Sequence, residues 1–577
     1  MSNLNAKKSL FLVLLSGAAF CVPQASFAQQ IAPEWSPMDD TSGPSAQQQG
    51  YGDDTNAEPA AKRRGARSKP RVEITPYIEV QQVAVVDFKN GGDVLTYSTV
   101  AAGIDASIQT KRAEGQINAR YERLIAYDKG VNAQDNISGL ARGALHITRN
   151  FSLEAGGIAS RSKVDGRGAS ATNLVGNPDN ITQVYSVYAG PTFTAQVGDV
   201  SLNAAYRAGY TKVKSKDVGS LPAGQLPFDQ FDDSVSHSAT ASVGMQPGAL
   251  PVGWSVGVGY DREDAGQLDG RYEGKFVRGD VTVPISGGLA VVGGIGYEAI
   301  KVSERDAVRD AAGVPVLDTD GRLVTNKAAP RLTAYQEDGL IWDVGVMWRP
   351  SNRTSVSGYY GRRYGSDTFG ANLSYQPNNQ WAVNASVYDQ VTSFGNLLND
   401  NLSALPTSFR NARNPLSGDL GTCSFGQSGG FCFNDALQSA NSASFRVRGV
   451  NAALSSTVGG WDTGIAAGYN RRKYLTFLAG ARADLAGLVD QNYFATAYIG
   501  KAIDQQSRFD TSVYANYFDP GSVGANDVLG VGANAAYYRT IIRGLSATAA
   551  VGLDSYRQKD FDTQLTGSAL LGLRYSF

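Results

Sequence analysis

Apolar and polar side chains alternate along most of this sequence with a period of two. In residues 72–80 the apolar Val, Ile and Pro occupy the even positions, whereas Glu73, Thr75 and Glu79 occupy odd ones. Because successive side chains of a β-strand point to opposite faces, this pattern predicts a strand with one apolar and one polar face. The pattern recurs to the end of the chain, most clearly in residues 100–109, 116–122, 200–208, 254–260, 340–348 and 545–553.

The predicted strands have the length of membrane crossings. Each is about 9–12 residues long, which is what a tilted strand needs in order to cross a bilayer. Their polar faces carry whole charges, which the core of a soluble β-sandwich would not accept without partners. We therefore expect the apolar faces to meet lipid and the polar faces to surround a wet interior. The predicted fold is an all-β, transmembrane, antiparallel up-and-down β-barrel over residues 72–577, with about 22 strands and a range of 18–24.

Short and long connections alternate between the predicted strands. The tiny turns include those near residues 110–112, 148–150, 286–288, 350–352, 377–379, 458–460 and 504–506. The intervening connections are mostly long, notably 163–180, 214–233, 303–333, 393–443 and 475–491. Outer-membrane barrels have short periplasmic turns and long extracellular loops. An even number of strands then places both ends of the barrel in the periplasm.

The first 28 residues have the features of a secretory signal peptide. Lys7 and Lys8 precede a mostly apolar run over residues 10–20, and small residues precede a cleavage site after Ala28. No other stretch approaches ~20 consecutive apolar residues, which excludes a helical inner-membrane protein. The protein is therefore expected to be exported, and the barrel pattern places it in the outer membrane.

The segments that flank the predicted barrel carry different signals. Residues 29–71 are polar and low in complexity, which predicts a disordered periplasmic tail. The basic stretch from Lys62 to Arg71 either contacts anionic lipid or cell-wall polymer or is merely solvated. At the other end, Tyr575 and Phe577 share one strand face. A terminal Phe with an aromatic residue two positions before it resembles the signal by which outer-membrane barrels are recognised for assembly.

Composition and charge narrow the function classes. The chain has 577 residues, of which 42% are hydrophobic and 18% charged, and its net charge is −1. Loss of the signal peptide removes two lysines and gives −3, so nothing suggests a nucleic-acid partner. Neither of the two histidines, His146 and His237, has a nucleophile at a telling spacing. We predict that the protein is not an enzyme, with no catalytic residue, no cofactor and no metal ligand.

Two cysteines of the exported chain, Cys423 and Cys432, lie in the longest predicted loop. Export leads through an oxidising compartment, so we predict a disulfide between them. The loop itself, residues 393–443, either sits on the cell surface or folds into the lumen as a constriction. The sequence leaves both arrangements open.

The inward face of the predicted strands is rich in charge. Alternation along the strands places nine charged residues there: Arg120, Glu122, Arg142, Arg207, Arg278, Asp280, Asp343, Arg446 and Arg448. Mixed charges among small neighbours are typical of a water-filled pore. The same residues are equally suited to ion-pair ladders that only brace the wall, and a barrel of this size is either open or plugged.

Two stretches carry a family resemblance. Residues 232–251 (DDSVSHSATASVGMQPGALP) resemble outer-membrane barrels of sphingomonads and related alphaproteobacteria. Residues 362–377 (RRYGSDTFGANLSYQP) resemble them too, and are also similar to barrels associated with exopolysaccharide systems. The resemblance implies location and fold rather than activity. Such proteins often carry the label "preprotein translocase subunit YajC", but true members of that family are short proteins with one membrane helix, which nothing here matches.

Three function classes follow for a barrel of this kind. The charged inner face with its small residues favours a porin-like channel for small solutes or oligosaccharides. The basic stretch and the long loops favour the alternative, a structural or export-associated barrel for surface polysaccharide or other envelope components. An energy-coupled transporter also has ~22 strands, but residues 29–71 are too short and too polar to form its plug. Expected partners are outer-membrane lipid, lipopolysaccharide, the barrel-assembly machinery, and polysaccharide or peptidoglycan.

Overall fold

The computed structural model describes most of the chain from Arg71 onward. The described ranges are 71–89, 94–127, 135–163, 181–214, 231–319, 322–426, 429–438, 440–477, 480, 485–521, 526–558 and 563–577. The predicted signal peptide with its cleavage site at Ala28, and the predicted tail except Arg71, lie outside these ranges. Both therefore stay predictions.

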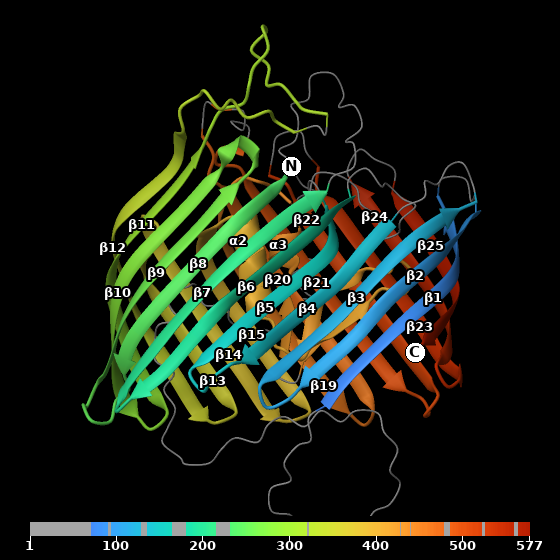
Figure 1. Cartoon of the computed structure of the whole chain (residues 1–577), viewed down its shortest axis with the longest axis horizontal. Coiled ribbons are helices and arrows are strands. Elements are labelled where there is room, and N and C mark those ends of the chain that lie inside the picture. Colours follow the sequence, from blue (N-terminus) through green and yellow to red (C-terminus); the bar gives the residue numbers. More distant parts are fainter. Residues whose placement is uncertain are drawn as a thin grey trace, which may run out of the picture.

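One antiparallel sheet of 22 strands closes on itself (Figure 1). Sequential strands pair as neighbours, and β1 also pairs with β25, with Tyr77 opposite Ser576. The strands are β1 (Arg71–Asp87), β2 (Val94–Gln109), β3 (Ala113–Ala126), β4 (Asp135–His146), β5 (Phe151–Lys163), β6 (Ile181–Val197), β7 (Val200–Lys214), β8 (Asp233–Met245), β9 (Gly253–Ala265), β10 (Arg271–Ser286), β11 (Leu289–Glu304), β12 (Leu332–Ser351), β13 (Thr354–Arg363), β14 (Ser366–Asn378), β15 (Trp381–Thr392), β19 (Phe445–Val458), β20 (Trp461–Tyr474), β21 (Val489–Ala502), β22 (Ser507–Asp519), β23 (Val528–Ile542), β24 (Leu545–Gln558) and β25 (Gln564–Ser576). The predicted all-β barrel and its strand number are confirmed.

The strands are longer than the sequence pattern predicts. They reach 20 residues in β12, and β13 has 10. The apolar pattern marks only the part of a strand that faces lipid. Backbone pairing needs no apolar side chains, so it continues past the edge of the apolar band towards the loops.

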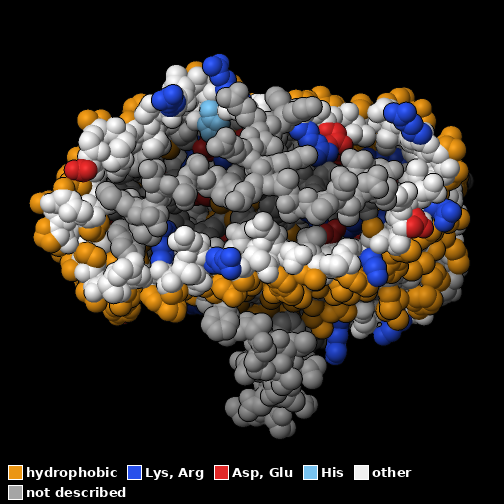
Figure 2. Space-filling model, turned by 90° about the horizontal axis from the view of Figure 1, so that it is seen from below, with side chains coloured by type: hydrophobic (Ala, Val, Ile, Leu, Met, Phe, Trp, Pro, Cys, Tyr) orange, Lys and Arg blue, Asp and Glu red, His pale blue; other side chains and the backbone are white. Residues whose placement is uncertain are grey.

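The two faces of the barrel wall have the predicted character. In β25, Leu571 and Leu573 lie on the outer face and are 69% and 52% exposed. Leu570 lies on the inner face of the same strand and is 2% exposed. Seen from the short-turn end, hydrophobic side chains gather around the outer perimeter (Figure 2). A closed barrel satisfies every strand edge, and this apolar exterior meets lipid. The protein is therefore located in the outer membrane.

The connections follow the predicted asymmetry, with one exception. Short turns gather at the end from which β1 starts, and the longer connections gather at the other end (Figure 1). At that other end, β13 and β14 are joined by only Tyr364 and Gly365. Both residues have a positive φ, +57° and +69°, which is the backbone that a tight hairpin of twisted strands requires. No helix among the described residues is long and apolar enough to cross a membrane.

The longest connection folds into the barrel rather than onto the cell surface. Residues 393–444, here called the lumen insert, join β15 to β19. They contain α2 (Phe394–Ala404), β16 (Arg410–Arg413), β17 (Leu420–Gly426), β18 (Gly429–Cys432) and α3 (Asn434–Leu437), and the three strands form a small sheet of their own. Helix α2 contacts β5, β6, β7 and β8, and Figure 1 shows α2 and α3 within the outline of the barrel. The question that the sequence leaves open is thereby answered.

Candidate functional site

An apolar seat on the inner wall holds α2. Phe394, Leu397, Leu398 and Leu402 of this helix are at most 1% exposed. They pack against apolar side chains that point inward from the wall, among them Leu140, Ile158, Val184, Tyr188 and Val213. Complete burial of such a side chain stabilises the packed state by roughly 1.5–3 kcal/mol. Exposure of this apolar patch to the water of an open pore would be unfavourable. The patch therefore favours the docked position of the insert.

The wall also caps the first turn of α2. Ser393 precedes the helix and makes no side-chain cap of its own. Instead, Glu263 of β9 accepts hydrogen bonds from Ser393 Oγ and from the backbone N–H of Asn396, both at 2.6 Å. A carboxylate at a helix N-terminus satisfies free N–H groups and complements the helix dipole. The first turn of α2 is therefore capped by Glu263 only when the helix is docked against the wall.

A side-chain amide fixes the rotation of α2 against the wall. Asn399 donates from Nδ2 to Ser236 Oγ at 2.8 Å and accepts from Ser186 Oγ at 2.9 Å. Gly209 of β7 makes this approach possible, because a Cβ at that position would lie 2.2 Å from Asn399 Nδ2. A side chain at position 209 would therefore displace the Asn399 amide and break this contact.

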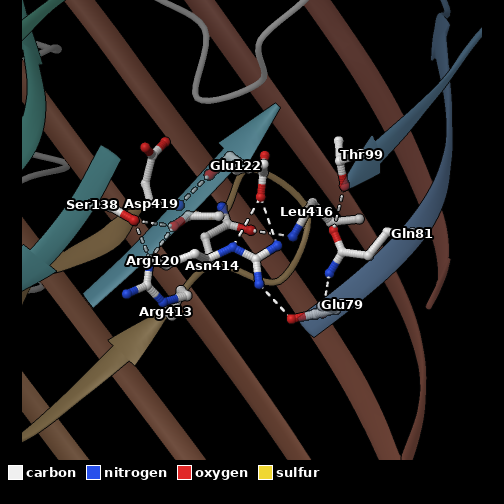
Figure 3. A network of polar contacts seen from close by, with 12 residues as sticks. Glu79, Gln81, Thr99, Arg120, Glu122, Ser138, Arg413, Asn414, Leu416 and Asp419 are labelled. Atoms are coloured by element: carbon white, nitrogen blue, oxygen red, sulfur yellow. Dashed lines mark hydrogen bonds and ion pairs between the residues drawn. The ribbon is translucent and has the colours of Figure 1, made fainter. Parts of the chain in front are cut away.

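Residues 413–419, here called the latch segment, tie the insert to β3–β5. Figure 3 shows Arg413 of this segment bonded to Ser138 of β4. Arg413 donates from Nη2 to Asn118 Oδ1 at 2.6 Å. At the other end of the segment, Arg161 donates from Nε to Asp419 Oδ1 at 2.5 Å. Charge-assisted hydrogen bonds of this kind are stronger than neutral ones. The segment is thus held to the wall at both of its ends.

Behind the latch segment lies a buried ion-pair cluster of the wall. Arg120 pairs with both Glu79 and Glu122, and its Nη2 lies 2.6 Å from Glu122 Oε2. All three residues are less than 10% exposed. Gly418 rests against this cluster with a φ of +69°, and a Cβ there would lie 2.6 Å from Glu122 Oε2. Position 418 therefore requires glycine both for its backbone and for its space.

The hairpin of β17 and β18 carries the disulfide. Cys423 and Cys432 face each other in its ladder and are joined by their sulfur atoms. Beside them, the ring of Phe425 packs on Tyr498 of β21 with centroids 5.4 Å apart. This hairpin reaches across the lumen towards the later strands, opposite the seat of α2.

The nine charged residues predicted for the inner face all take part in ion pairs. The pairs are Arg120 with Glu79 and Glu122, Arg142 with Glu154, Arg207 with Asp400, Arg278 with Asp280 and Asp343, and Arg446 and Arg448 with Asp389. Three of these pairs join neighbouring strands, two bridge strands that are two apart, and two lie within one strand, so they brace the wall. The pair of Arg207 with Asp400 joins the wall to α2 at 3.9 Å. That any of the nine lines an open path stays a prediction.

A cavity of about 290 Å³ separates the insert from the wall of β21–β25. Its lining includes Tyr498, Tyr514, Tyr556, Asn492, Asn516, Asn534 and Asp554. None of the nine predicted charged residues contributes to it. Charge along the inward face does not reveal this lining, because most of its residues are uncharged. Its signal is the recurrence of tyrosine and asparagine at inward positions of the late strands, such as Asn492 and Tyr498 in β21.

The known proteins that resemble this chain are similar to it in fold alone. No family model and no curated protein matches the chain. Similar solved structures include the FrpB iron transporter of Neisseria meningitidis, at 11% identity and a TM-score of 0.41 over 87% of this chain and 81% of that one. The ferric-catecholate import receptor Fiu of E. coli aligns at 11% identity and a TM-score of 0.43 over 86% and 81%. The alcaligin outer-membrane receptor FauA of Bordetella pertussis aligns at 12% and 0.36 over 89% and 77%.

Proposed function

We propose that the chain is a porin-like channel through which small polar solutes cross the outer membrane. The observation that carries the proposal is the cavity of about 290 Å³ between the lumen insert and β21–β25. On the opposite side, α2 packs against the seat with side chains that are at most 1% exposed, so this contact is closed to water. The route for a solute is therefore the side of the insert that faces β21–β25.

Because the lumen insert is anchored to the wall, the route between the insert and β21–β25 has a defined width. The capping of α2 by Glu263, the latch segment and the packing of Phe425 on Tyr498 hold the insert at three separate places. A barrel of 22 strands without a filled lumen would leave a wide aqueous channel. In this proposal the insert narrows the lumen, so that the pore admits small solutes and excludes large ones.

Conductance in planar bilayers tests the proposal. We expect discrete small steps from the full-length protein. We expect steps several-fold larger from a variant in which residues 394–443 are replaced by a short Gly/Ser linker. The matched control shortens residues 306–326, which belong to the loop that projects beyond the barrel in Figure 1, and should leave the step size unchanged. A full-length protein that is silent while the linker variant conducts would contradict the proposal, because the insert would then be a complete plug.

The alternative, a structural or export-associated barrel, stays a prediction. Its motivation is the long loops together with the basic stretch before Val72, which lies outside the described residues apart from Arg71. Among the described residues, the segment that occupies the lumen is an internal one, the lumen insert.

A further inference from the structure

The lining of the cavity carries almost no unbalanced charge. Arg161 is the only Arg or Lys among the described residues that line it, and this guanidinium is already paired with Asp419. The remaining charged group, Asp554, accepts a hydrogen bond from the Tyr514 hydroxyl at 2.7 Å. Recognition of carboxylates or phosphates relies on arginine or lysine. The cavity therefore lacks the chemistry that would select an anionic solute.

Three amide oxygens of the lining have no hydrogen-bond donor among the described residues. They are Asn492 Oδ1, Asn516 Oδ1 and Gln564 Oε1, each a buried atom. A buried acceptor without a donor is unfavourable, so each of them favours a solute that brings a donor. Asn492 is itself only 1% exposed and lies at a fixed inward position of β21. Hydroxyl groups supply such donors without bringing charge.

Aromatic rings stand beside these amides. Tyr498, Tyr514 and Tyr556 line the cavity from β21, β22 and β24, and Phe425 lines it from the insert. A sugar ring presents an apolar C–H face as well as hydroxyl edges. Flat aromatic rings pack against such a face, and neighbouring amides pair with the hydroxyls.

We infer that this cavity is a binding site for neutral saccharides of one or two rings. The inference rests on the proposed channel, whose solute class it names. The volume of about 290 Å³ lies at the small end of ligand pockets, roughly 300–1,000 Å³, which suits a short saccharide rather than a polymer. Tyrosine rings bind the ring faces, and the three amide oxygens accept hydrogen bonds from hydroxyls.

Equilibrium dialysis of the full-length protein in detergent tests the inference, with lactose and lactobionate as probes. These two molecules are of similar size, but lactobionate is an anion. We expect lactose to bind and lactobionate to bind at least about tenfold more weakly. Tyr514→Ala and Asn516→Leu should each weaken lactose binding by about tenfold. Tyr517→Ala is the matched control, because Tyr517 lies on the same strand with its ring on the outer face, next to that of Tyr493.

Migration on a gel before and after heating shows whether each variant has a folded barrel. Failure of lactose to bind, tighter binding of lactobionate, or equal weakening by Tyr517→Ala would overturn the saccharide site. Bilayer recordings separate this outcome from a failure of the channel. Conductance steps that lactose does not block would overturn the saccharide site and leave the channel. Lactose binding by a protein that never conducts would overturn the channel and leave the site.

Discussion

Asp435 is a buried carboxyl group of the lumen insert whose charge is disfavoured by its surroundings. It lies in α3, is 4% exposed, and accepts hydrogen bonds from Asn401 Nδ2 at 2.8 Å and from the backbone N–H of Ala436 at 2.9 Å. The nearest cation, Arg472, is already paired with Asp490 at 2.6 Å. Burial therefore raises the pKa of Asp435 to about 6, against the smaller lowering by these hydrogen bonds.

Docking of the insert should weaken as the pH rises through this pKa. In a released, hydrated insert the carboxyl group has its ordinary pKa of about 3.9. The protonated form is thus favoured in the docked state, and the associated stability is complete below about pH 4 and lost as the pH rises to about 6. We expect large-conductance openings to be more frequent at about pH 7.5 than at about pH 4.5, and Asp435→Asn to reduce the difference. An unchanged pH dependence in the variant would assign the effect to another group.

At the scale of elements, the lumen insert is a small folded segment whose hydrophobic core is shared with the barrel wall. Its three short strands form a separate sheet, but the apolar face of α2 is completed by the barrel wall. The disulfide lies within the insert and does not join it to the barrel. It therefore restricts the hairpin of β17 and β18 without anchoring the insert to any strand of the wall.

Removal of the disulfide should loosen the hairpin and leave the barrel intact. Closing a loop with a sequence separation of 9 removes chain entropy equivalent to about 2–3 kcal/mol. In a variant with Cys423→Ser and Cys432→Ser, we expect faster hydrogen exchange in residues 420–432 and noisier single-channel currents, with unchanged migration of the folded barrel. A reducing agent should give the same result in the native protein and no further change in the variant. Native exchange rates in the variant would show that wall contacts alone hold the hairpin.

At the scale of the whole molecule, the terminal strand closes the barrel and ends in an exposed ring. Phe577 is 71% exposed, and its ring contacts that of Tyr575 with centroids 5.1 Å apart. Its backbone N–H donates to the carbonyl oxygen of Pro76 at 3.0 Å, a bond that does not need the ring. The phenyl group therefore contributes little packing to the finished barrel, although the sequence predicts a role for it in assembly.

Truncation of Phe577 separates assembly from stability. We expect Phe577→Ala to lower the amount of folded protein in the outer membrane several-fold while the urea midpoint of the purified barrel stays the same. Leu571→Ala is the matched control, because Leu571 is 69% exposed on the same face and should leave the amount unchanged. Equal losses in both variants would mean that exposed apolar area, and not a terminal signal, determines the yield.

The sequence by itself determined the barrel, its strand number and the two faces of its wall. These features depend on a period of two, which each strand carries in its own residues and which backbone geometry converts into an inside and an outside. Only the tertiary structure decided where the lumen insert lies and where the cavity remains. Arg413 meets Asn118, and the seat of α2 combines side chains from many strands, so these contacts join residues that no local pattern relates. Long-range packing selects such pairs by shape and charge after the chain has closed into a barrel.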